Sequence, residues 1–116
     1  MYLSKTIPVP IYSTKVRFIV TGDAKKTVNS FHKKHNIHHK YEDCIEGLMF
    51  TVGMDIYNII IDSNYLSHNT IQHETFHAVM AITADRNIFE EEQRAWLMGY
   101  LGQEIQNFLK SKKVSL

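Results

Sequence analysis

Apolar and polar side chains alternate along residues 15–21, which predicts a β-strand with one face in the core. Val16, Phe18 and Val20 would form the buried face, and Gly22 would end the strand. This strand is therefore expected to be half-buried.

Two further apolar stretches, residues 48–52 and 56–61, predict a β-hairpin with a turn near Gly53. The second stretch is almost wholly apolar, so it is expected to be the more buried strand. A polar loop follows at residues 62–69.

Two helices are predicted on either side of this hairpin in the sequence. The first covers residues 24–35 and begins at Asp23, a favourable N-cap. The second begins at a cap supplied by Asn69 or Thr70 and ends near residues 85–86. Its core-facing stripe would consist of Ile71, Ala78, Val79 and Ile82.

A third helix is predicted to begin at a capping box formed by Asn87 and Glu90 and to run to about Lys110. Its apolar stripe would consist of Leu97, Leu101, Ile105 and Phe108. Small residues on another face would let a neighbouring helix approach closely. They are Ala95, Gly99 and Gly102.

The predicted order of elements is β-α-β-β-α-α, and the predicted fold class is α+β. One minimal domain would span residues 1–116, with a small sheet packed on the second and third helices. Residues 1–12, which include both prolines, are expected to form an extended arm or an edge strand, and residues 111–116 a basic tail.

The composition is that of an ordinary globular protein, with 44% hydrophobic residues and a formal net charge of +1 at pH 7. These values argue against a nucleic-acid-binding protein and against a disordered chain. The sequence has neither a secretory signal nor an apolar run of the roughly 20 residues that span a membrane, so a cytoplasmic location without membrane contact is expected. The single cysteine, Cys44, excludes an internal disulfide and is expected to be a buried or half-buried apolar residue.

A chemical function is indicated by residues 73–77, HETFH, which have the H-E-x-x-H pattern. Residues four apart on a helix lie on one face, so His73 and His77 can bind one Zn²⁺. Glu74 would lie toward the open side and act as general base for a zinc-bound water.

A third zinc ligand is expected from the acidic start of the third helix, at Glu90, Glu91 or Glu92. Glu90 already has a capping role, whereas Glu91 and Glu92 flank the small-residue face at similar angles. The spacing leaves the choice between Glu91 and Glu92 open.

Two segments, residues 70–78 (TIQHETFHA) and 92–101 (EQRAWLMGYL), resemble the small zincin-like metallopeptidases of gluzincin type that bacteriophages and mobile elements often encode. The resemblance covers the C-terminal half of the chain and implies that the third zinc ligand is Glu92. It also implies a peptide or protein substrate, which would lie extended along the strand 56–61 or along its hairpin partner.

Two other interpretations stay open. The chain could be a metal-stabilised binding module without activity, such as a phage accessory or anti-defence protein, because its small size leaves little room for a second cleft wall. The motif could also be accidental in a metal-free α+β domain. The sequence does not determine the oligomeric state.

Less specific signals come from other histidines and from tyrosines. His32, His35, His38 and His39 are interleaved with lysines that would repel a cation, so this stretch is predicted to be a solvated surface. A His or Tyr donor would stabilise the oxyanion formed during hydrolysis. The candidates, which spacing does not separate, are Tyr57, Tyr65, His68 and Tyr100.

Overall fold

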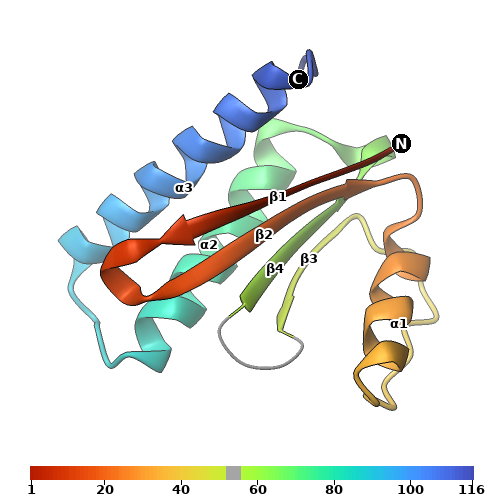
Figure 1. Cartoon of the computed structure of the whole chain (residues 1–116), viewed down its shortest axis with the longest axis horizontal. Helices are drawn as coiled ribbons and strands as arrows, with labels where there is room; N and C mark the ends of the chain where they lie inside the picture. Colours follow the sequence, from red (N-terminus) through yellow and green to blue (C-terminus); the bar gives the residue numbers. More distant parts are fainter. Residues whose placement is uncertain (52–55) are drawn as a thin grey trace.

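A mixed four-stranded β-sheet with three α-helices forms the protein in the computed structural model, which describes residues 1–51 and 56–116 (Figure 1). The predicted α+β fold class is confirmed. The elements in chain order are β1 (Tyr2–Val9), β2 (Thr14–Thr21), α1 (Ala24–Lys34), β3 (Gly47–Thr51), β4 (Ile56–Asp62), α2 (His68–Asp85) and α3 (Glu91–Ser111), with 3-10 turns at Pro10–Tyr12 and Ser63–Tyr65.

The N-terminal residues form an edge strand, so the order is β-β-α-β-β-α-α. Strand β1 pairs antiparallel with β2 over its whole length, from Tyr2 opposite Thr21 to Val9 opposite Thr14. Its proline at position 8 is compatible with an edge position, where a missing N–H breaks no internal ladder. Of the two possibilities expected for residues 1–12, the edge strand is the one that forms.

The strands lie in the order β1-β2-β4-β3, with β2 and β4 parallel and the other pairs antiparallel. The hairpin partner β3 is therefore an edge strand, whereas β4 is paired on both sides and buried along nearly its whole length. The predicted turn near Gly53 lies outside the described residues.

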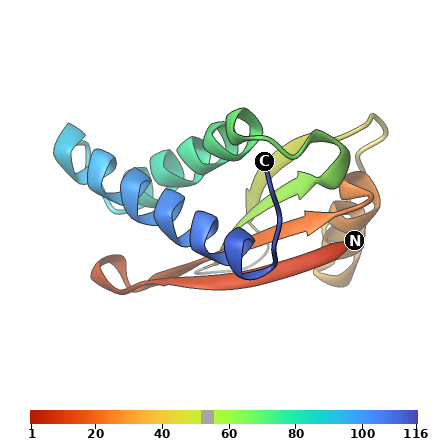
Figure 2. The ribbon, with the colours of Figure 1, turned by 90° about the horizontal axis from the view of Figure 1, so that it is seen from above.

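Helices cover both faces of the sheet, with α2 and α3 on one face and α1 on the other (Figures 1 and 2). Strand β2 contributes Phe18 to the first of these cores and Ile19 to the second. Both side chains are fully buried. The expectation of a half-buried β2 was wrong because α1 and the segment that follows it cover the second face.

The starts of the two C-terminal helices differ from the prediction. Ser67 caps α2, because its side chain accepts a hydrogen bond from the main-chain N–H of Thr70 at 3.1 Å. Asn87 does not begin a capping box; it has a left-handed φ of 56° at the end of α2. The N-cap of α3 is Glu90, whose side chain makes no capping hydrogen bond.

Helix α3 packs through its apolar stripe and not through its small residues. Leu97, Leu101 and Ile105 are fully buried. A Cβ atom added at Gly99 or Gly102 would meet nothing within 4 Å. The expectation that the small-residue face admits a neighbouring helix was therefore wrong.

Cys44 is exposed and is not the buried apolar residue that was expected. It lies in the irregular segment between α1 and β3, outside the core. No helix in the described parts of the chain has the length and apolarity needed to cross a membrane.

Candidate metal centre

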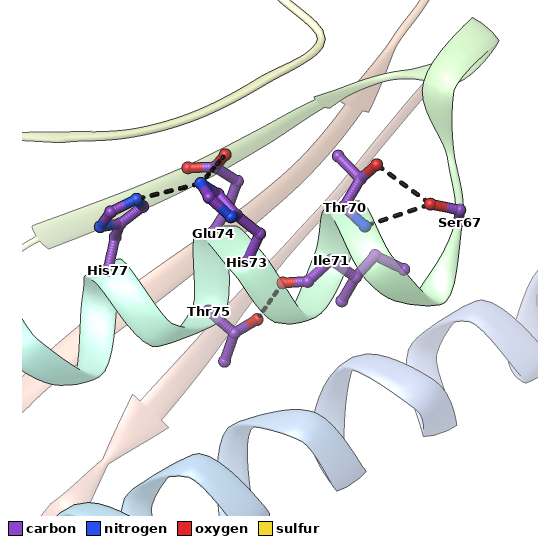
Figure 3. A network of polar contacts seen from close by, with 7 residues as sticks. All are labelled: Ser67, Thr70, Ile71, His73, Glu74, Thr75 and His77. Carbon is purple, nitrogen blue, oxygen red and sulfur yellow. Dashed lines mark hydrogen bonds and ion pairs between the residues drawn. The ribbon is translucent and has the colours of Figure 1, made fainter.

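Two histidines converge on the exposed side of α2. His73 and His77 lie one helical turn apart, and their Nε2 atoms are 3.2 Å from each other (Figure 3). Both residues are exposed, while the apolar stripe of the same helix is buried. The sequence prediction that the histidines lie away from this stripe is confirmed.

Glu74 joins this pair from the side of the helix that meets the sheet, so the expectation that it lies toward the open side was wrong. Its Oε2 atom lies 3.8 Å from Nε2 of His73, and the carboxylate accepts a hydrogen bond from the main-chain N–H of Met49 in β3. The residue is only 7% exposed. An ordinary solvated helix glutamate is thus excluded for this position.

Burial raises the pKa of Glu74 above its ordinary value, because a charged carboxylate loses solvation there. Positive charge on His73 and His77 and the Met49 N–H act in the opposite direction and lower this pKa. A carboxyl group beside two imidazoles is placed to accept and return a proton, and the raised pKa of Glu74 increases its affinity for that proton.

The start of β3 fixes the distance between the strand and this part of α2. A Cβ atom at Gly47 would lie 3.0 Å from Cγ2 of Thr70 and 3.1 Å from Cγ of Glu74. The absence of a side chain therefore lets α2 approach the edge strand closely. Sequence reasoning missed this residue, although a glycine in a strand is a general signal of close backbone approach.

The separation of the two histidine nitrogens fits two of the four positions of a tetrahedral zinc site. Two nitrogen ligands of a tetrahedral Zn²⁺, at Zn–N distances of about 2.0–2.1 Å, lie about 3.3 Å from each other. The observed separation of His73 Nε2 and His77 Nε2 is 3.2 Å. Ligand atoms of His73, Glu74 and His77 all lie within 4.8 Å of one another, and no larger group of potential ligands forms around them in residues 1–51 and 56–116.

The structure does not bring Glu91 or Glu92 to the histidines. The first turn of α3 lies beside the C-terminal end of α2, where Arg94 Nε donates to Thr83 Oγ1 at 3.0 Å. Thr83 is about 15 Å along the helix from His73, at a rise of about 1.5 Å per residue. Figure 3 shows the histidines and α3 on opposite sides of α2. In this structure Glu91 and Glu92 therefore lie apart from the two histidines.

A cavity of about 640 Å³ opens beside His73 and Glu74. Its other walls come from Tyr41 and residues 43–48, from Tyr65, and from Asn69 and Thr70 near the start of α2. The residues before β3 contribute two carboxylates and no cationic side chain to this lining. Sequence reasoning missed these walls because no periodicity marks the segment.

The four candidates for oxyanion stabilisation differ in whether they line this cavity. Tyr65 lines it together with His73. The Tyr57 hydroxyl donates to Asp85, and the Tyr100 hydroxyl donates to the carbonyl oxygen of Pro8, so both are occupied elsewhere. His68 borders different hollows, between α2, α3 and the C-terminus.

The second histidine group forms no metal site within the described parts of the chain. His32 is buried, and its Nδ1 atom is hydrogen-bonded to the carbonyl oxygen of His39 at 3.1 Å. The prediction of a solvated surface was wrong for His32, while His35, His38 and His39 are exposed as expected.

Comparison of the chain with protein-family models, with curated proteins and with solved structures gives no match. The functional interpretation of the site therefore rests on its residues and their geometry.

Proposed function

We propose that the protein is a zinc-dependent hydrolase that acts as a metallopeptidase. The observation that carries the proposal is the convergence of His73 Nε2 and His77 Nε2 at 3.2 Å, with the Glu74 carboxylate 3.8 Å from the first of them. His73 and His77 hold the metal. Glu92, which the zincin resemblance suggests as a third ligand, has no part in this proposal because α3 lies on the far side of α2.

Glu74 carries the proton in the reaction. Bound zinc supplies a Lewis acid that lowers the pKa of a coordinated water toward about 7. Glu74 takes the proton of the attacking water and returns it to the leaving amine. The Met49 N–H restrains the carboxylate, and burial keeps its proton affinity above that of a solvated glutamate.

The substrate is a peptide or protein segment bound in extended form. Strand β3 presents an edge that faces away from β4, and its Met49 already contacts the Glu74 side chain. Main-chain pairing along this edge would bring a peptide carbonyl close to the histidines. Tyr65, in the adjoining cavity, is the side chain we assign to the oxyanion.

The test compares three variants with the unsubstituted protein after reconstitution with zinc. Glu74→Gln should keep bound zinc and lower hydrolysis of an unstructured protein such as casein by at least about 10²-fold, the usual contribution of a general base. His77→Ala should lose both zinc and activity. Glu92→Gln, a matched removal of a helix carboxylate, should change neither.

Each result decides between the interpretations. A Glu74→Gln protein that hydrolyses casein as well as the unsubstituted chain would refute the mechanism. Zinc held at one equivalent without any hydrolysis favours the non-catalytic binding module. No zinc in the reconstituted protein, measured by elemental analysis, would overturn the metal site itself, and loss of zinc in Glu92→Gln would restore the gluzincin ligand set.

A further inference from the structure

A second cavity, distant in sequence from the metal centre, lies between α1 and the segment that follows it. Its volume is about 660 Å³, within the range of small-molecule sites. Residues 24–40 contain five lysines and four histidines and no carboxylate. We use the name lysine cavity for the hollow lined by α1 and residues 36–40.

Hydrogen bonds between side chains and main chain build the walls of the lysine cavity. Asn36 has a left-handed φ of 58° and turns the chain back along α1 (Figure 1). Asn29 donates through Nδ2 to the carbonyl oxygen of Tyr41 and accepts from its N–H, at 3.0 and 2.8 Å. His32 adds its hydrogen bond to the carbonyl oxygen of His39. These bonds attach the returning segment to α1 at two points, Asn29 and His32.

The lining places positive charge on both walls. Lys26 and Lys33 lie two turns apart on one face of α1, and Lys40 comes from the opposite segment together with His38 and His39. None of these three lysines forms an ion pair in the part of the chain that the structure describes. The lining contains no carboxylate. No carboxylate of the described residues therefore neutralises these lysines by direct contact.

We propose that the lysine cavity binds a small ligand that carries at least two phosphate groups. Lysine ammonium groups bind phosphate oxygens as point charges, and three of them around one hollow match a diphosphate better than a single monoanion. Ile37, His38 and His39 also line the cavity, and side chains of these types suit contact with an organic body attached to the phosphates. The lysine cavity shares no lining residue with the cavity beside His73 and Glu74.

The experiment uses the full chain without metal, so that phosphate cannot bind through zinc. Inorganic pyrophosphate and ADP are titrated at low ionic strength while the amide signals are followed by NMR. Saturable shifts confined to residues 26–41 are expected, with a dissociation constant of about 1 mM or lower. ADP binding more tightly than pyrophosphate would show that the organic body contributes.

A pair of charge-matched variants provides the control. Lys33→Gln combined with Lys40→Gln should weaken binding on the order of tenfold. Lys15→Gln combined with Lys110→Gln removes the same charge from exposed positions elsewhere and should leave affinity nearly unchanged. Circular dichroism checks that both variants fold.

Three outcomes overturn the proposal. They are the absence of saturable shifts, equal weakening by both pairs of substitutions, and binding of a single-stranded oligonucleotide by a protein that does not bind pyrophosphate. The last outcome would assign the surface to a nucleic-acid polymer instead of a small ligand.

Discussion

Replacing Gly47 by alanine tests how closely α2 must lie on the edge strand. The added Cβ would lie 3.0 Å from Thr70 Cγ2, 3.1 Å from Glu74 Cγ and 3.3 Å from Ile61 Cδ1. All three distances are shorter than ordinary van der Waals contact, which begins near 3.4 Å. These three side chains must therefore give way by a few tenths of an ångström, either by their own rotation or by movement of the elements that carry them.

The destabilisation expected for Gly47→Ala follows from the usual effect of overpacking a protein interior. Extra methylene groups in a packed interior cost about 1–3 kcal/mol. Replacing glycine also stabilises the protein by roughly 0.5–1 kcal/mol, because alanine loses less backbone freedom on folding. The expected result for Gly47→Ala is a net loss of about 1 kcal/mol in the free energy of unfolding, measured by urea denaturation.

Gly99→Ala is the matched control, because it makes the same chemical change where nothing lies within 4 Å of the new atom. In the middle of α3 it should stabilise the protein by about 0.8–1 kcal/mol through helix propensity. The two variants should thus differ by about 2 kcal/mol, or roughly 8 °C in Tm for a domain of this size. Equal stability of the two proteins would refute the packing argument.

The Gly47 substitution should also disturb the metal centre. One of the three contacts is the Glu74 side chain, whose carboxylate is held by the neighbouring Met49 N–H. We expect Gly47→Ala to lower hydrolysis, measured well below its Tm, with bound zinc retained. Unchanged turnover in a destabilised Gly47→Ala protein would show that Glu74 tolerates the displacement.

Three further predictions concern single side chains. Ser67→Ala removes the side-chain acceptor of the Thr70 N–H and should destabilise the protein by about 1 kcal/mol in urea denaturation; an unchanged midpoint would contradict this capping role. Burial, and next the hydrogen bond to Asp85, raise the pKa of Tyr57 above its usual value of about 10. The stability that protonated Tyr57 contributes is complete below about pH 10 and is lost as the pH rises through the higher folded-state pKa, so Tyr57→Phe should show a smaller alkaline decrease in unfolding free energy; an identical pH profile would argue against it. Tyr65→Phe should lower turnover on the order of 10²-fold at constant zinc content if this hydroxyl stabilises the oxyanion, whereas full activity would reassign that role.

Much of the fold could be predicted because it follows from local periodicity. The strand pattern at residues 15–21, the buried stripe of α2 and the stripe of α3 all correspond to observed buried positions. The pattern of residues 1–12 does not distinguish an arm from a strand, because an edge strand is stabilised by its partner and not by its own pattern. The caps of α2 and α3 were misassigned for a related reason, since several polar residues compete for each helix start.

The shared face of His73 and His77 follows from the sequence without any tertiary contact, because the 3.6-residue period places residues four apart on one side of a helix. Packing between elements places Glu74 in a buried position against β3, Glu92 far from the histidines, and Tyr65 at the border of the neighbouring cavity. These relations depend on which face of each helix meets the sheet and on where α3 begins. The net charge of +1 does not indicate the lysine cavity, because it contains no information on where the charged side chains lie in the folded protein.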